Sequence, residues 1–162
     1  MTQRGPPDIV DAPRLVAVGL LISRDRVLVL RRRRDGPLPN QWECPGGKVE
    51  FGEHPCDALR RELREELNLQ VARGRFFGIY SHVYDLGGQH VHYVLVAYRC
   101  PLAQSRVRET ETRQWATVGE LRRWPVVPGS RPNDAIETEP SEITVCRRLG
   151  TGSGWHCDAR CA

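Results

Sequence analysis

Three glutamates in one short amphipathic stretch constrain the structure more than any other feature of this sequence. Glu62, Glu65 and Glu66 stand at positions i, i+3 and i+4, so at about 100° per residue their side chains share one helix face. Beside them runs an apolar stripe at i, i+4 and i+8, made of Leu59, Leu63 and Leu67. We therefore expect a helix over about 55–67 that is anchored in a core and carries concentrated negative charge.

The acidic face has two interpretations. Arg60, Arg61 and Arg64 interleave with the glutamates, which is typical of an exposed helix with weak surface ion pairs. The preceding residues favour a divalent cation instead. A Pro-Gly-Gly turn at 45–47 allows close backbone approach, and Glu53 adds a carboxylate just before the helix. Because Mg²⁺ takes oxygen ligands, this arrangement suits a magnesium site.

Residues 47–69 resemble the Nudix box, the sequence motif of the Nudix hydrolase superfamily. The pattern is Gly, five residues, Glu, seven residues, Arg-Glu, an aliphatic residue, any residue, Glu-Glu, any residue, Gly and an aliphatic residue. The one departure here is Asn68 at the final glycine, and asparagine also tolerates the left-handed conformation of a helix end. The resemblance covers residues 14 to about 138 and is closest to the MutT-like (d)NTP pyrophosphohydrolases.

The resemblance implies that water attacks a phosphorus of a diphosphate linked to another group, with Mg²⁺, or alternatively Mn²⁺, holding the phosphates. By position in the box, Glu65 and Glu66 match the principal metal ligands. Glu62 matches either a further ligand or the base that activates water, and the Gly47 carbonyl matches another metal contact. Arg61 matches the arginine that orients a box glutamate.

The family often needs a further carboxylate from a loop that precedes a Trp-containing strand. Glu109 and Glu111 both precede Trp115, and the spacing of Glu109 resembles the MutT branch, so we favour Glu109 and keep Glu111 as its substitute. Both could instead be solvated loop charges. Within the box, Glu53 is expected to support the site without binding the metal.

Substrate contacts are predicted from the resemblance to MutT and related CTP pyrophosphohydrolases. The candidates are Arg31, Arg32, Lys48, Tyr84 and Asn133. Lys48 and one of the two arginines, with Arg32 favoured, would contact phosphate. Asn133 would read the base, and Tyr84 or Tyr80 would stack on it, although sheet packing is the favoured interpretation of both tyrosines.

Length and composition fit one domain, because 162 residues with 40% apolar content can bury a core of their own. We expect a flexible leader at 1–13, the Nudix domain at 14–138, and a C-terminal helix with a Gly/Cys-containing flexible tail at 139–162. The resemblance implies an α+β fold, an α/β/α sandwich with a mixed sheet and the catalytic loop and helix. The expected strands are 15–22, 27–30, 76–84, 90–100 and 113–118, with an extended stretch at 42–50 and further helices at 119–124, 134–137 and 142–149.

The formal charge of +4 is modest, but glutamates concentrate in the box while arginines dominate elsewhere. That division suits a polyanionic substrate. The sequence has no convincing targeting or membrane segment, so the expected location is the cytoplasm. The six cysteines form no CxxC pair, and we expect most of them to be reduced thiols of the core or the surface.

Three functions remain possible. The leading one is hydrolysis of a nucleoside triphosphate to a monophosphate and pyrophosphate, with modified nucleotides among the possible substrates. The second is hydrolysis of ADP-ribose, a nucleotide sugar or a dinucleoside polyphosphate. The third is a noncatalytic nucleotide or RNA binder that uses the basic run at 31–34, although the complete box argues against it. The expected partner is a small nucleotide, with neither membrane nor nucleic acid, and the chain is a monomer or a homodimer.

Overall fold

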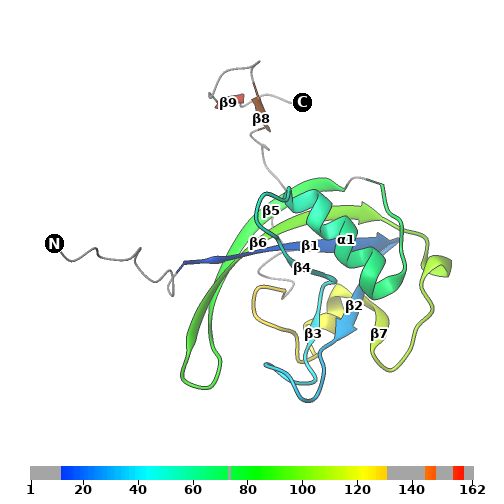
Figure 1. The fold of residues 1–162 in the computed structure, drawn as a ribbon. Coiled ribbons are helices and arrows are strands. Elements are labelled where there is room, and N and C mark those ends of the chain that lie inside the picture. The colour runs from blue at the N-terminus through cyan, green and yellow to red at the C-terminus, as the bar shows by residue number, and fades with distance from the viewer. Residues whose placement is uncertain (1–11, 73, 131–144, 149–154, 159–162) are drawn as a thin grey trace.

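The computed structural model describes residues 12–72, 74–130, 145–148 and 155–158. Its strands are β1 (Arg14–Ser23), β2 (Arg26–Arg31), β3 (Trp42–Glu43), β4 (Gly46–Lys48), β5 (Arg75–Asp85), β6 (His90–Pro101), β7 (Arg113–Thr117), β8 (Val145–Arg148) and β9 (Trp155–Asp158). Its helices are α1 (Pro55–Leu67), the short 3-10 helix η1 (Gln104–Arg106) and α2 (Val118–Leu121). Figure 1 shows α1 lying across the large sheet.

Seven strands form one mixed sheet. The central order is β3-β2-β1-β6-β5, with β4 pairing on β1 and β7 pairing on β2. Strands β1 and β6 run parallel, whereas the other pairs of this sheet are antiparallel. Two strands pair with the same edge of β1: β4 pairs near the start of β1, and β2 pairs near the end of β1. This sharing places the glycine turn beside the middle of the sheet.

Helix α1 has the limits that the sequence predicts. It begins at Pro55, and the side chain of His54 caps it by accepting a hydrogen bond of 3.1 Å from the Cys56 backbone N–H. It ends at Asn68, which has a left-handed conformation with φ of 52°, so the departure from the motif preserves the helix end. The predicted leucine stripe is confirmed, since Leu59, Leu63 and Leu67 are all buried in the main core.

The face of the sheet opposite α1 is covered by a short helix and irregular chain, where the expected sandwich has a second helical layer. Val29 and Ala116 point away from α1 and pack with Trp42, Leu121 and Val126 in a second cluster. Leu121 belongs to α2, which has four residues and a capping box at Thr117. The α+β class and the mixed sheet are confirmed. Among the described residues, the second outer layer of the expected sandwich is this short helix and the chain that follows it.

Three expected elements differ from the structure. The extended stretch at 42–50 is divided into β3 and β4, and the helix expected at 119–124 is α2, which ends at Leu121. The helix predicted over 142–149 is wrong for residues 145–148, which form β8 and pair with β9. Backbone pairing with a second segment is a tertiary interaction that local helical spacing does not report. The helix expected at 134–137 lies outside the described residues.

Two further expectations concern the character of the chain. Cys44, Cys56 and Cys100 are free and buried, as predicted for reduced thiols. No helix in the described part of the chain is long and apolar enough to cross a membrane.

Candidate active site

The glycine turn brings the backbone of β4 into direct contact with its neighbours. At Gly46, φ is 147° and a side chain would overlap the Ala17 carbonyl of β1. At Gly47 a Cβ atom would overlap the carboxylate of Glu62. The two glycines therefore serve different purposes: Gly46 lets β4 pair closely with β1, and Gly47 leaves the space that the Glu62 carboxylate fills.

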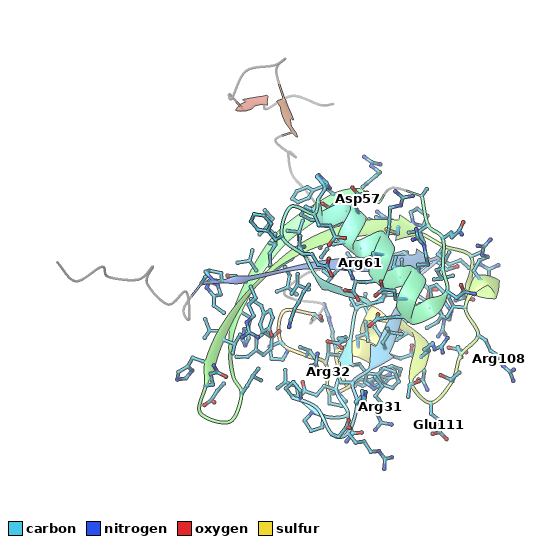
Figure 2. All side chains as sticks on the ribbon, viewed as in Figure 1. Arg31, Arg32, Asp57, Arg61, Arg108 and Glu111 are labelled. Carbon is cyan, nitrogen blue, oxygen red and sulfur yellow. The ribbon has the colours of Figure 1, made fainter. Side chains whose placement is uncertain are left out.

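Arg61 organises the carboxylates at the start of the site. Its guanidinium binds both carboxylate oxygens of Glu53 at 3.1 Å and one oxygen of Glu62 at 2.7 Å. It also donates to the Lys48 carbonyl at 3.0 Å, and lies 3.6 Å from Glu65. The hydrogen bond from Arg61 lowers the pKa of Glu53. One arginine thus ties the box loop, strand β4 and helix α1 together, and Figure 2 shows it midway along the helix.

Glu66 is the carboxylate whose ionisation is most perturbed. Partial desolvation raises its pKa to about 7, helped by the negative charges of Glu62, Glu43 and Glu65, while a hydrogen bond from the Gly46 backbone opposes the shift. The helix contributes Glu62 and Glu65, but Glu43 comes from β3. The site therefore concentrates negative charge from two elements, and a cation would relieve the repulsion.

The donor set fits a hard divalent cation such as Mg²⁺ or Mn²⁺. Glu62 lies against the Gly47 backbone, and Glu66 is held beside Gly46. The side chain of Glu65 is 59% exposed and pairs with Arg61 at 3.6 Å. Within the described residues, no three acidic, histidine or cysteine side chains are already gathered as a metal cluster. The geometry accounts for this, because Arg61 holds Glu62 by an ion pair, so the ligands would have to close on the ion.

A cavity of about 220 Å³ opens on the other side of the glycine turn. Its polar wall carries Arg32, Glu43, Gly46, Gly47 and Lys48. Its apolar wall comes from several strands, from the segment between β2 and β3 and from the chain after α2, with Val16, Val18, Leu38, Tyr84, Tyr93, Leu95 and Val127. Backbone of the glycine turn thus separates an apolar hollow from the carboxylates of α1.

Three of the predicted substrate residues line this cavity: Arg32, Lys48 and Tyr84. Arg32 is fixed by hydrogen bonds to Glu43 at 2.6 Å and to the Pro37 carbonyl at 2.9 Å. Lys48 is exposed at the mouth. Tyr84 is 8% exposed, its hydroxyl donates to the Pro128 carbonyl, and its ring meets Tyr93 edge-on at 5.5 Å. Tyr84 therefore forms part of the wall by packing, as favoured for the tyrosines.

Arg31 and Asn133 are not brought to the cavity by the described structure. The Arg31 guanidinium lies 5.8 Å from the centre of the Trp42 ring. Arg31 lines a second hollow together with Arg32, Arg33 and Arg34. Arg31 is the last residue of β2 and Arg32 follows it. Arg32 lines both the second hollow and the cavity, whereas Arg31 is not among the residues that line the cavity. Asn133 lies outside the described residues.

The loop carboxylates lie apart from the cavity. Glu109 accepts a hydrogen bond of 2.9 Å from the Trp115 backbone and lines a hollow with Arg26 and Arg108. Glu111 lines the arginine hollow beside Arg31. In Figure 2, Arg108 and Glu111 lie toward the lower right, away from Arg61. A role for Glu109 as base stays a prediction, and it would require the carboxylate to leave the Trp115 backbone.

Two residues of the site were not predicted. Glu43 pairs with Arg32, and burial raises its pKa while Arg32 lowers it. Cys44 lines the cavity, and burial raises the pKa of its thiol to about 12, so the thiol is neutral. Their position directly before the Pro-Gly-Gly turn could have indicated that they lie near the site. The direction of their side chains depends on how β3 pairs with β2, which the sequence does not show.

Comparison with known proteins adds a family match. A model of the NUDIX domain matches residues 13–134. A Mycobacterium tuberculosis H37Rv protein, provisionally named 8-oxo-dGTP diphosphatase 2, is 37% identical over 119 residues, covering 72% of this chain and 82% of that protein. The CTP pyrophosphohydrolase of Escherichia coli K12 is 31% identical, covering 71% of this chain and 84% of that protein. The 8-oxo-dGTP diphosphatase of the same strain is 26% identical, covering 83% and 96%.

Solved structures share the fold. A MutT NUDIX hydrolase from Burkholderia pseudomallei has a TM-score of 0.64 and 25% identity, and the match covers 75% of this chain and 95% of that chain. The E. coli ORF135 protein has a TM-score of 0.60 and 26% identity, covering 78% of this chain and 89% of that chain.

Proposed function

This chain belongs to the NUDIX domain family, and we propose that it hydrolyses nucleoside triphosphates to monophosphates and pyrophosphate with the help of a divalent metal ion. Relatives named 8-oxo-dGTP diphosphatase and CTP pyrophosphohydrolase support this substrate class. The observation that carries the proposal is the shared wall at Gly46 and Gly47. Their backbone lines the cavity on one side and contacts Glu62 and Glu66 on the other.

This arrangement fits a nucleotide bound across the wall. Apolar side chains such as Val16, Leu95 and Val127 would enclose the base. Arg32 and Lys48 would contact the phosphates at the rim, where a fixed guanidinium can bind two phosphate oxygens. The scissile linkage would then lie over the glycine turn, next to the carboxylates of α1.

The box carboxylates would hold the metal, which is Mg²⁺ in our proposal and Mn²⁺ as an alternative. Glu65, Glu66, Glu62 and the Gly47 carbonyl are the proposed ligands. When bound, such an ion neutralises phosphate charge and lowers the pKa of the attacking water. Arg61 would act as a positioning residue, because it fixes Glu62 and Glu53 without facing the cavity.

A carboxylate would accept the proton of the attacking water. Glu62 is one candidate, since it is the most firmly positioned of the helix carboxylates. Glu109 is the other, provided that its loop moves toward the substrate. Comparing Glu62→Gln with Glu109→Gln in kcat at several pH values would separate the two.

A panel assay tests the proposal. The purified chain would be incubated with Mg²⁺ and with dNTPs, rNTPs, 8-oxo-dGTP, ADP-ribose, a nucleotide sugar and diadenosine polyphosphates, and the products identified by chromatography. We expect triphosphates to give a monophosphate and pyrophosphate. Preferred turnover of ADP-ribose or a dinucleoside polyphosphate would replace this substrate class with the second candidate. No turnover at all, together with tight salt-sensitive RNA binding, would favour the noncatalytic binder.

The assignment of Glu65 and Glu66 as metal ligands can be tested by comparing amide variants of three carboxylates in α1. Glu65→Gln and Glu66→Gln each remove a proposed ligand, whereas Asp57→Asn removes a carboxylate that pairs with Arg60 at the start of α1. We expect both glutamine variants to lose at least about 100-fold in kcat, and Asp57→Asn to keep wild-type activity. Full activity in the double variant Glu65→Gln/Glu66→Gln would contradict the assignment.

A further inference from the structure

Residues 126–130 lie beyond α2 in the chain and form one side of the cavity. Val127 is 5% exposed and Ser130 is 8% exposed, and both line the cavity. The segment therefore presents an apolar group and a hydroxyl to whatever the cavity binds. A base held in the cavity would contact this segment, so the position of the segment decides which bases fit.

The start of this segment is fixed to β3 by backbone hydrogen bonds. The Val127 N–H donates to the Trp42 carbonyl at 2.9 Å, and the Trp42 N–H donates to the Pro125 carbonyl at 2.8 Å. The chain then turns, because the Ser130 N–H donates back to the Val127 carbonyl at 2.9 Å. The segment is thus tied to the β3 side of the cavity.

On its other side the segment is held by a side chain of β5. The Tyr84 hydroxyl donates to the Pro128 carbonyl. The Tyr84 ring is itself fixed by edge-on contacts with His82 at 4.6 Å and with Tyr93 at 5.5 Å. Val127 and Pro128 are consecutive, so the chain connects β3 with β5 within two residues. Figure 1 shows this part of the chain between β3 and the long curved hairpin of β5 and β6.

Gly129 makes the close approach to Tyr84 possible. Its φ is 84°, and a Cβ atom would lie 3.3 Å from the Tyr84 hydroxyl oxygen and 3.5 Å from Cδ1 of Leu95. Glycine adopts this backbone conformation without strain. A side chain at this position would also press on the hydroxyl, so the segment packs directly on Tyr84 and on the Leu95 wall of the cavity.

We propose that the Tyr84 hydroxyl is a positioning group that determines base selectivity, because it sets the separation between residues 126–130 and the β5–β6 hairpin. This separation fixes the width of the cavity. Without the contact to Pro128 the segment and the hairpin would move apart, and the cavity would accept bases of different size. The inference rests on the proposed hydrolysis of nucleoside triphosphates, in which the cavity holds the base.

A purely structural role for Tyr84 would have different consequences. Loss of a residue that only stabilises the fold lowers the folded fraction, and activity on every substrate then falls by the same factor. Loss of a positioning group in the base cavity changes the ratio of kcat/KM between bases. Because the scissile linkage would lie over the glycine turn, the change should appear in KM more than in kcat.

Kinetics of Tyr84→Phe test the selectivity, since this variant loses the hydroxyl and keeps the ring. We expect KM for the preferred triphosphate to rise about 5–10-fold, the effect of losing one hydrogen bond, with kcat changed by less than about threefold. The ratio of kcat/KM between purine and pyrimidine triphosphates should move at least about threefold toward one.

Tyr98→Phe is the matched control for loss of a buried tyrosine hydroxyl. Tyr98 is 7% exposed in the main core and is not among the described residues that line the cavity. This variant should keep the wild-type ratio of kcat/KM between bases. An unchanged ratio in Tyr84→Phe would overturn the proposal.

A second pair of variants approaches the same contact from the segment. Gly129→Ala would place a methyl group against the Tyr84 hydroxyl, whereas Gly88→Ala places one in open space. Gly88 has nearly the same backbone conformation, with φ of 88°, so both variants introduce similar backbone strain. The ratio of kcat/KM between bases should change in Gly129→Ala alone, and equal ratios in the two variants would contradict a role for this contact.

Amide hydrogen exchange tests the contact without any substrate. In Tyr84→Phe the Val127 and Ser130 amides should exchange at least about tenfold faster than in the wild type, because the segment opens more often. Tyr98→Phe should leave both rates unchanged. A wild type that hydrolyses no triphosphate would overturn the proposed function, while the exchange rates would still show whether Tyr84 holds the segment. Unchanged exchange in Tyr84→Phe would overturn the present inference whatever the activity.

Discussion

Gly47 illustrates how the absence of a side chain can position a catalytic group. Its Cα faces the Glu62 carboxylate so closely that a methyl group would overlap it. The carboxylate is held from its other side by Arg61 at 2.7 Å. Glu62 therefore has little room to move, and its position depends on a residue that contributes only backbone.

Gly47→Ala should consequently move Glu62 and lower kcat by about 100-fold, because displacement of a catalytic group by about 1 Å has effects of this size. Steady-state kinetics on the preferred triphosphate would measure the change. Gly119→Ala is the matched control: Gly119 lies in α2 and has room for a methyl group, so its kcat should be unchanged. Equal activity of the two variants would show that Glu62 need not lie against β4.

Glu66 gives the site a dependence on pH. Its pKa is raised from 4.5 to about 7 in the folded protein. Between these values the folded chain holds a proton that the unfolded chain has released, so the contribution of Glu66 to the free energy of unfolding falls as pH rises. This contribution is fully present below about 4.5 and is lost as pH passes through about 7.

We therefore expect metal-free wild type to lose Tm relative to Glu66→Gln between about pH 5 and pH 8, because the amide does not titrate. Mg²⁺ should raise the wild-type Tm more at pH 8 than at pH 5, since a proton competes with the ion for the carboxylate. Differential scanning calorimetry in EDTA and in Mg²⁺ would measure both effects. Parallel curves for wild type and variant would contradict the raised pKa.

At the scale of elements, α1 combines a structural and a chemical face. Its leucines fix it on the sheet, and its glutamates then face the glycine turn. The helix has to end before Leu69, because the Leu69 side chain is buried in the core. The chain reverses there, and the Leu69 backbone N–H donates to the Leu63 carbonyl at 3.1 Å. Asn68 makes this reversal in the left-handed region.

Asn68→Ala should destabilise the protein by about 1–2 kcal/mol, because a Cβ is unfavourable in the left-handed conformation and alanine lacks the polar side chain that offsets this cost. Asn68→Gly should retain wild-type stability or exceed it, since glycine adopts that conformation freely. Urea unfolding would measure both free energies. An alanine variant as stable as the glycine variant would remove the conformational explanation.

At the scale of the whole molecule, two adjacent arginines at the end of β2 have different surroundings, although both line the second hollow. Arg32 enters the cavity and is held by Glu43 of β3. Arg31 lies over the Trp42 ring and is not among the residues that line the cavity. The distinction arises from the pairing of β2 with β3 and β7, which fixes the direction in which each side chain points.

Arg32→Gln should lower kcat/KM about 10–100-fold, the effect of losing a hydrogen bond to a charged group. Arg31→Gln, which makes the same chemical change one residue earlier, should alter kcat/KM by less than about threefold. Kinetics on the preferred triphosphate would compare the two. Similar losses in both variants would show that the arginine hollow also binds substrate.

Local patterns were sufficient for several elements. The spacing of Leu59, Leu63 and Leu67 defined the buried face of α1, and Pro55 and Asn68 marked its limits, because caps and periodicity are properties of neighbouring residues. The same reasoning was wrong at 145–148, where backbone pairing with residues 155–158 makes a strand. It also did not indicate Glu43, whose contact with Arg32 depends on strand pairing.

The sequence by itself determined the helix, the three carboxylates that share its face, and the glycine turn before it, because each depends on spacing within a few residues. The family resemblance favoured Arg32 over Arg31 and expected Arg61 to orient a box glutamate. Only the tertiary structure decided that Arg61 joins Glu53, Glu62 and the Lys48 carbonyl at once, and that Glu43 holds Arg32 at the cavity. These contacts depend on the direction of side chains from separate elements. That direction is set by the pairing of β1, β2, β3 and β4 and by the packing of α1 on their sheet.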